Sequence, residues 1–267
     1  MTQGGPLPFD ISVPNPARMW NYWVGGKDNF AADREAAEEV TAAMPQLPAI
    51  ARLVRRFLVS TVHELAAEHG IRQFLDIGTG LPTADNTHDV AQRAAPGARI
   101  VYVDYDPVVL SHARALLTSS PEGSTDYIQA DLRDTGTILS GAARTLDFGQ
   151  PVAVLLLAVL HFIPDSDDPY GIVRRLMAAV PSGSYLVICH SASDIDAETV
   201  AEHARQYNGR AAAVITPRSH EQVARFFDGL ELDRRGLVPL SRWFDAGQAG
   251  VSSTSGLAGY CGIGRKG

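Results

Sequence analysis

The sequence predicts a doubly wound α/β fold, in which helices cover both faces of a parallel sheet, preceded by a helical extension. From residue 72 onward, short apolar segments alternate with segments of helical periodicity. Strands and helices that alternate in this way form βαβ units with right-handed crossovers. The apolar segments are nearly uninterrupted, as PVAVLLLAV at residues 151–159 shows, and this is expected of strands that are buried on both faces.

The first part of the chain is predicted to be an extended arm followed by three helices. Residues 1–16 are rich in proline, and we expect them to form a partly mobile arm. Helices are expected at residues 17–24, 31–44 and 48–69. In the third helix, apolar residues recur at spacings of three and four from Ile50 to Leu65. This spacing makes one buried stripe, and Gly70 ends the helix.

Five strands and four helices are predicted to follow in alternation. The strands are expected at residues 73–77, 99–104, 126–130, 151–159 and 184–190. The helices between them are expected at residues 83–95, 107–117, 131–143 and 169–180. In an open sheet of this kind, ligands bind at the carboxyl ends of the strands.

The last third of the chain is less regular. A helix is expected at residues 196–207. Another is expected from residue 216 or 217 to residue 227, with Thr216 as its cap and Pro217 in its first turn. Two further strands are expected within residues 231–240 and 256–264, on either side of a glycine- and serine-rich loop at residues 247–256.

The composition argues against some partners. The chain of 267 residues carries a net charge of −7, whereas binding to a nucleic-acid backbone depends on Lys and Arg neutralising phosphates. The best candidate for a basic patch is Arg52, Arg55 and Arg56, which we interpret as a solvated helix face. No metal site is expected, because Cys189 and Cys261 lie in apolar segments typical of buried, reduced thiols.

No membrane segment is expected either. The longest apolar run, at residues 152–160, is far too short to span a bilayer. The first residues lack a basic stretch followed by an apolar one, so no signal peptide is expected and a cytoplasmic location follows. The sequence leaves the oligomeric state open.

Three carboxylates stand at the ends of the first three predicted strands. Asp76 opens the turn DIGTG, in which Gly78 and Gly80 let the backbone turn tightly and approach a ligand closely. Asp104 ends the second strand, where a carboxylate can accept two hydrogen bonds from a ribose diol. Asp131 follows the third strand, where it can accept from an adenine amine. Each aspartate alone is equally typical of a helix cap, but the three in register favour a nucleoside site.

Two kinds of nucleoside ligand compete for this pattern. A dinucleotide-binding fingerprint requires a third glycine in GxGxxG, which allows close packing of the helix on the strand. Here that third position is Thr83, and Asp76 is not part of the fingerprint. The sequence therefore favours a ligand without a pyrophosphate.

Four motifs resemble those of the class I S-adenosylmethionine-dependent methyltransferases: DIGTG, VDYDP, QADLRD and LLLAVLHFIPD. The amino-terminal stretch NPARMWNYWVGGKDNFAADREAA resembles a narrower group, the actinobacterial S-adenosyl methyltransferase family long catalogued as a domain of unknown function. This second resemblance covers nearly the whole chain. It implies S-adenosylmethionine as the cofactor and an antiparallel final strand near residues 258–264, which completes a mostly parallel sheet of seven strands.

The resemblance also implies which residues bind the cofactor. They lie at the ends of the first four strands and are Asp76, Gly78, Thr79, Gly80, Asp104, Tyr105, Asp131, Leu132, Ala158 and Val159. By resemblance, Asp76 would line the methionine end, Asp104 would hold the ribose, Tyr105 would pack on the adenine and Asp131 would hold its edge. Pro82 departs from many relatives, which have glycine or a small residue there. Residues 48–267 would form the cofactor-binding domain, and residues 1–47 an arm and a helical lid.

Methyl transfer requires a nucleophile held in line with the methyl group, and a base helps where that nucleophile is protonated. His161, just past the fourth strand, is the best-placed candidate, and His190 at the end of the fifth strand is a second. The alternative is that these histidines pack or cap the turns after the strands. The chain lacks an Asn/Asp-Pro-Pro-aromatic tetrapeptide and a Pro-Cys nucleophile. Together with the acidic net charge, this favours a small-molecule acceptor, with a protein side chain as the alternative.

The amino-terminal motif is a second candidate site. It crowds aromatic and polar side chains into eleven residues, namely Trp20, Tyr22, Trp23, Lys27, Asp28, Asn29 and Phe30. We expect this segment to fold over the pocket as a lid, with glycines as its hinge. The alternative is a helical hairpin that packs its aromatic residues against the edge of the sheet.

Different classes of function stay open. The first is an S-adenosylmethionine-dependent methyltransferase acting on a small molecule. The second is a protein that binds or senses S-adenosylmethionine without catalysis. A third and weaker alternative is a nicotinamide-dependent oxidoreductase.

Overall fold

A mixed sheet with the expected parallel centre forms the middle of the molecule. The computed structural model describes residues 10–109, 111, 119–208, 214–244 and 258–267. The strands are β1 (Gln73–Ile77), β2 (Arg99–Asp104), β3 (Ser124–Gln129), β4 (Ala153–Leu157), β5 (Tyr185–Ser191), β6 (Leu230–Leu232), β7 (Val238–Pro239) and β8 (Gly259–Lys266). Their order is β3-β2-β1-β4-β5-β8-β6, with the two-residue β7 also pairing with β8. The sheet thus has one short strand more than expected.

The topology of the sheet follows from how these strands pair. The five strands β1 to β5 are mutually parallel, whereas β8 runs antiparallel to β5, β6 and β7. The order reverses between β1 and β4, which are neighbours in space but not in sequence. This is the topological switch point, outside which ligands bind in open α/β sheets.

Two apolar clusters fill the space between the sheet and its helices. Consecutive strand residues point to opposite faces, so Phe74 belongs to one cluster and Leu75 to the other. The first face is covered by α3 (Leu47–Ala67) and α4 (Thr87–Ala94), and the second by α6 (Thr135–Ala142), α7 (Pro169–Ala178) and α9 (His220–Ala224). Both cysteines are free and buried, as expected.

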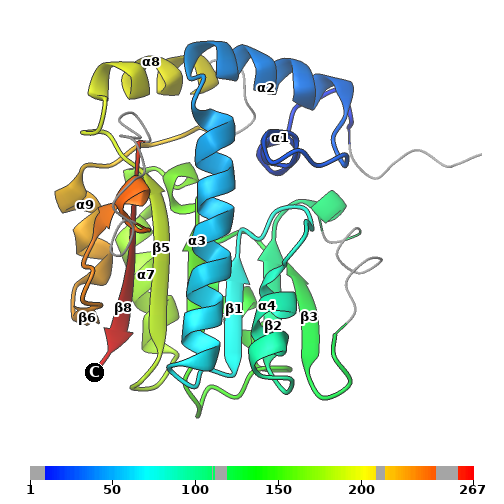
Figure 1. Ribbon diagram of the computed structural model, residues 1–267, viewed down its shortest axis with the longest axis vertical. Coiled ribbons are helices and arrows are strands. Elements are labelled where there is room, and N and C mark those ends of the chain that lie inside the picture. Colours follow the sequence, from blue (N-terminus) through cyan, green and yellow to red (C-terminus); the bar gives the residue numbers. More distant parts are fainter. Residues whose placement is uncertain (1–9, 110, 112–118, 209–213, 245–257) are drawn as a thin grey trace, which may run out of the picture.

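The amino-terminal extension is a pair of helices, α1 (Pro16–Trp23) and α2 (Ala31–Ala43). Asn15 caps α1 by accepting from the Ala17 amide at 2.8 Å, and Pro16 takes the first position. Figure 1 shows both helices above the carboxyl ends of the central strands, with α8 (Ala197–Asn208) beside α2. Met19 and Trp23 belong to the same apolar cluster as α3 and the sheet. The amino-terminal helices therefore share one apolar core with the rest of the molecule. The proposed boundary at residue 47 distinguishes two functions, a lid and a cofactor-binding domain, and it stays a proposal.

Two predicted helices begin later than expected, because polar residues cap their amino-terminal ends at later positions. α4 starts at Thr87 rather than residue 83, since Asn86 and Asp89 form a capping box there. α6 starts at Thr135 rather than residue 131, since the Asp134 carboxylate accepts from the Thr137 amide at 3.0 Å. Both delays leave a loop at the carboxyl end of a strand.

The helix predicted from residue 216 or 217 is shorter, and Thr216 as its cap was wrong. The cap of α9 is Ser219, and a 3₁₀ turn continues the helix through Phe227. The preceding residues are extended, because the Arg218 amide donates to Ser191 and its carbonyl accepts from Ser193. Apart from residues 107–109 and 111, which are helical, the helix expected at 107–117 lies outside the described residues, as does the loop at 247–256. No helix in the described ranges is long and apolar enough to cross a membrane.

Candidate functional site

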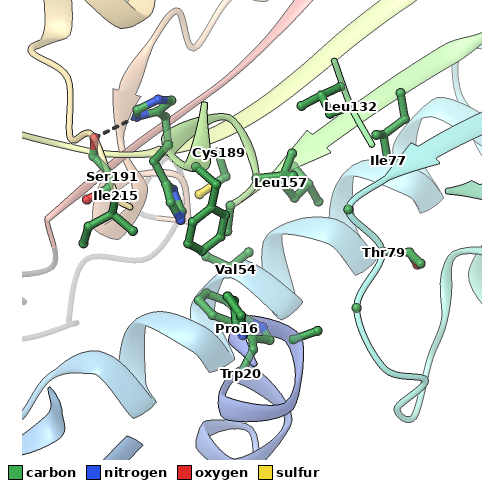
Figure 2. A pocket seen from close by; sticks show the side chains of 18 of the residues that line it. Pro16, Trp20, Val54, Ile77, Thr79, Leu132, Leu157, Cys189, Ser191 and Ile215 are labelled. Carbon is green, nitrogen blue, oxygen red and sulfur yellow. Dashed lines mark hydrogen bonds between the residues drawn. The ribbon is translucent and has the colours of Figure 1, made fainter. Parts of the chain in front are cut away.

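A cavity of about 550 Å³ opens at the carboxyl ends of the central strands, under the amino-terminal helices (Figure 2). This volume is within the range of small-molecule sites. Its lining includes Asp76, Asp104 and Asp131 together. The other residues expected to bind a cofactor also line it, namely Gly78, Thr79, Gly80, Tyr105, Leu132, Ala158 and Val159. The convergence of these residues is confirmed, and their binding roles stay predictions.

The turn after β1 depends on its glycines. Gly78 and Gly80 have φ angles of 75° and 65°, a region that favours glycine. A Cβ on Gly78 would lie 2.5 Å from a methyl carbon of Val159, whereas one on Gly80 would meet nothing within 4 Å. The Gly78 and Thr79 amides donate to the Val103 carbonyl, which ties the turn to β2. Space is therefore left beside Gly80 for a ligand.

Two buried carboxylates are held firmly beside this turn. Asp104 accepts from the Gly80 amide at 2.9 Å and from the Asp106 amide at 3.0 Å. Asp76 accepts from the Thr87 hydroxyl at 2.6 Å, at the start of α4. Burial raises the pKa of each carboxyl to about 6. Thr87 was not predicted from the sequence as a site residue, because the helix was expected to start four residues earlier, at residue 83.

The third carboxylate lies at the open side of the cavity. Asp131 accepts from the Arg133 amide at 2.8 Å and from the Arg133 guanidinium at 2.7 Å. Arg133 also donates to Asp167 at 2.7 Å and lines the cavity itself. Tyr105 is 51% exposed, so its ring presents a free surface beside the cavity. The sequence did not predict Arg133, whose role depends on a contact 34 residues away.

The loop after β4 leaves the sheet through a strained residue. Ala158 has a φ of 55° although it carries a Cβ, and its amide donates to the Cys189 carbonyl at 2.8 Å. A non-glycine residue in this region costs about 1–3 kcal/mol and is typical of functional sites. The turn brings His161 and Phe162 to the cavity wall.

His190 is enclosed by partners on both ring nitrogens. Its Nε2 lies 2.9 Å from Nη1 of Arg218, and its Nδ1 lies 2.8 Å from the Ser191 carbonyl. An arginine can only donate, so Nε2 accepts and Nδ1 carries the proton. Burial lowers the pKa of His190 to about 3. This geometry suits a neutral, positioning residue and gives no support to His190 as a base.

Arg218 organises this part of the site and was missed by sequence analysis. The side chain is fully buried and donates to the carbonyls of Leu160 at 3.2 Å and Ile163 at 2.8 Å. It also donates to the Asp165 carboxylate at 2.7 Å. Arg218 therefore ties the segment after β4 to the end of β5.

His161 remains the better-placed candidate base. It lines the cavity, its ring contacts Phe162 at a centroid distance of 4.4 Å, and His190 lies edge-on at 5.8 Å. Its carbonyl accepts from the Thr216 amide at 2.7 Å, which fixes its backbone. Its catalytic role stays a prediction.

The amino-terminal motif divides into two groups. Trp20 and Trp23 line the cavity together with Pro16 and Ala17. The other residues expected in a lid do not line the described cavity: Tyr22, Lys27, Asp28, Asn29 and Phe30. The expectation that all seven face the pocket was therefore too broad.

These remaining residues build the hairpin between α1 and α2. Asn21, which was not predicted, accepts from the Asp28 amide at 3.0 Å and from the Asn29 side chain at 2.9 Å. Tyr22 donates to Glu38 at 2.8 Å. A Cβ on Gly26 would overlap the Asn21 amide group. The second glycine of the motif is thus required for packing, and this part fits the hairpin alternative.

Arg55 departs from the solvated helix face expected for it. Arg52 and Arg56 are exposed, but Arg55 lines the cavity near Asp76. It lies on the same side of α3 as Val54 and Leu58, which also line the cavity.

Among the described residues no group of three or more His, Cys, Asp or Glu is placed to hold a metal.

Comparison with known proteins identifies relatives of the whole chain. Residues 3–267 match the family described as S-adenosyl methyltransferase. The crystal structure of a DUF574 family protein from Streptomyces avermitilis is 42% identical, with a TM-score of 0.92 over 97% of this chain and 99% of that one. A protein from Thermobifida fusca with a provisional methyltransferase assignment is 38% identical, with a TM-score of 0.88 over 96% of each chain.

More distant likenesses concern the fold alone. A SAM-dependent methyltransferase from Anabaena variabilis is 12% identical, with a TM-score of 0.51 over 76% of this chain and 80% of that one. No curated protein matches the chain.

Proposed function

Because the chain belongs to the S-adenosyl methyltransferase family, we propose that it transfers the methyl group of S-adenosylmethionine to an apolar small molecule held in the same cavity. The observation that carries the proposal is the division of one cavity into two chemical parts. Buried carboxylates and a glycine turn line one part, and apolar side chains line the other.

The polar part suits the nucleoside and amino-acid groups of the cofactor. Both oxygens of Asp104 are oriented by backbone amides, and each keeps a lone pair that can accept from a ribose hydroxyl. Asp131 would accept from the adenine amine while Tyr105 packs on the ring. Asp76 would attract the α-ammonium group, and the space beside Gly80 admits the ligand close to the backbone.

The apolar part suits an uncharged acceptor. It is formed by residues from α1, the end of α2, α3 and two segments in the last part of the chain, namely Trp20, Trp23, Met44, Leu47, Ile50, Val214, Ile215 and Leu240. These described lining residues include no charged side chain, and desolvating a charged acceptor against them would be unfavourable. An apolar body with one nucleophilic atom is the acceptor class that this chemistry fits.

The chain's own residues would position the acceptor and exclude water. When bound, S-adenosylmethionine supplies an already activated methyl group. Trp20 and Trp23 cover the cavity from α1, so a bound acceptor is shielded from solvent. His161 would accept the proton that a hydroxyl group of the acceptor loses as it is methylated. His190 and Arg218 would hold the backbone that presents His161.

A screen for methyl acceptors tests this proposal. We expect labelled S-adenosylmethionine to give a labelled product with apolar, organic-soluble extracts of actinobacterial cells. At a cofactor concentration below the wild-type dissociation constant, the Asp104→Ala variant should give roughly 10- to 150-fold less product. Label found only in protein or nucleic acid would contradict the small-molecule proposal. Binding of the cofactor without any transfer would favour the sensing protein.

Cofactor affinity is expected to fall as the pH is lowered through about 6. Burial raises the pKa of both Asp76 and Asp104 to about 6, so both lose their charge below that pH. Affinity should fall about tenfold per pH unit for each carboxylate that must be ionised. Below that pH the folded chain binds more protons at these two groups than the unfolded chain, so their protonation favours folding. The fall in affinity is therefore not caused by unfolding linked to these two groups.

Calorimetric titration between about pH 5 and 8 measures this profile. The Asp104→Asn variant is the matched control and should show a shallower fall, because one of the two groups no longer titrates. An affinity that does not change across this range would show that neither carboxylate binds the cofactor in its charged form.

A further inference from the structure

Arg55 on α3 has a buried donor that the protein itself does not use. Its Nη2 atom donates to the Ala84 carbonyl at 2.8 Å and lies 3.5 Å from the Asn86 side-chain oxygen. These contacts fix one end of the guanidinium against the loop between the glycine turn and α4. Its Nε atom is buried and has no hydrogen-bond partner among the described residues.

An unused buried donor on a charged group is costly unless something accepts from it. Buried polar groups are nearly always hydrogen-bonded, and an unsatisfied one costs more when it carries charge. Asp76 attracts Arg55 electrostatically but has its own hydrogen bond from Thr87. The guanidinium therefore has spare capacity for an anion inside the cavity.

Charge and position together specify that anion. Arg55 and Asp76 line the same part of the cavity, next to the glycine turn. They present one positive and one negative group there, which is the complement of an amino acid zwitterion. Arginine binds carboxylates with two parallel donors, so a carboxylate can use both Nε and a terminal nitrogen.

We infer that Arg55 binds the α-carboxylate of the amino-acid part of S-adenosylmethionine, while Asp76 faces its α-ammonium group. This inference rests on the proposed function and adds a specificity determinant to it. The site should then select nucleosides that carry an intact amino acid. Decarboxylated S-adenosylmethionine keeps the adenosine, the sulfonium and the ammonium, so it should bind poorly.

Calorimetric titration with S-adenosylmethionine and its decarboxylated form tests the inference. We expect the wild-type chain to prefer the intact compound roughly 10- to 100-fold, the scale of hydrogen bonds to a charged group. The Arg55→Met variant should lose this preference by binding the intact compound more weakly, with unchanged affinity for the decarboxylated form. Arg55→Lys should keep part of the preference, because lysine retains the positive charge but lacks the two parallel donors of the guanidinium group. Arg52→Met, an exposed change on the same helix, should leave both affinities unchanged.

The other outcomes are distinguishable. Equal wild-type affinities for the two compounds would overturn the role of Arg55 and leave the proposed function standing. An equal loss of both affinities in Arg55→Met would also overturn it, since it would show that Arg55 only fastens the loop. Binding of neither compound to the wild-type chain would overturn the proposed function and this inference with it.

Discussion

Replacement of Arg218 by methionine is expected to lower the free energy of unfolding by about 3–5 kcal/mol, because three buried acceptors each lose a hydrogen bond at a cost of about 1–3 kcal/mol. The substitution keeps an unbranched but shorter side chain and removes every donor. The carbonyls of Leu160 and Ile163 and the Nε2 atom of His190 would then lose their hydrogen bonds in a buried region. Each such loss carries a desolvation cost. Asp165 adds little to this cost, because its side chain is 61% exposed and can turn to water.

Urea unfolding of the wild-type and variant chains measures this change. Arg174→Met serves as the control, because that side chain is 71% exposed and its removal should cost less than about 0.5 kcal/mol. A loss below about 1 kcal/mol in Arg218→Met would show that water or a rearranged loop replaces these hydrogen bonds.

Replacement of Asp104 by alanine is expected to weaken binding of S-adenosylmethionine by about 1.5–3 kcal/mol, or roughly 10- to 150-fold. The variant removes the charged acceptor that both the Gly80 and Asp106 amides orient. It leaves the cavity and its apolar lining in place. Asp104→Asn should weaken binding at least as much as Asp104→Ala, because the charge is lost and the new NH2 group would face one of these two amide donors.

Titration calorimetry of the variants gives the affinities directly. Asp126→Ala is a suitable control, because Asp126 lies on the neighbouring strand β3 and does not line the described cavity. That control should bind the cofactor as the wild-type chain does. An Asp104→Ala variant with unchanged affinity would remove Asp104 from the cofactor site.

The sequence predicted the parts of the site that depend on strand ends. The strands at residues 73–77 and 99–104 have the predicted bounds, because their apolar runs are bounded by residues that leave the sheet. Asp76 and Asp104 end or nearly end those strands, so parallel pairing alone brings them to one edge. The relation between a strand and the residue that follows it is local, and the sequence pattern therefore predicts it.

The residues that were missed depend on contacts between distant segments. Arg218 joins atoms that are 28 to 58 residues away in the chain, and no local pattern encodes such a network. Asn21 and Thr87 act through the exact path of a turn and a helix start.

Arg55 differs from these residues, because the sequence of its own helix contains an indication that it is not fully solvated. Ala51 and Leu58 share its helix face, at spacings of four and three residues. A charge on the border of an apolar stripe is compatible with a solvated face, and the sequence does not show that the stripe's edge borders a cavity. The structure was needed to place the guanidinium against the glycine turn.

Titration of the wild-type chain with S-adenosylmethionine, S-adenosylhomocysteine and NAD tests the assignment of the cavity most directly. We expect the first two to bind at one shared site, because the carboxylates and the glycine turn are arranged for a nucleoside without a pyrophosphate. We expect no competition from NAD. Binding of NAD, with no response to S-adenosylmethionine or S-adenosylhomocysteine, would contradict the assignment of this cavity to the methyl donor.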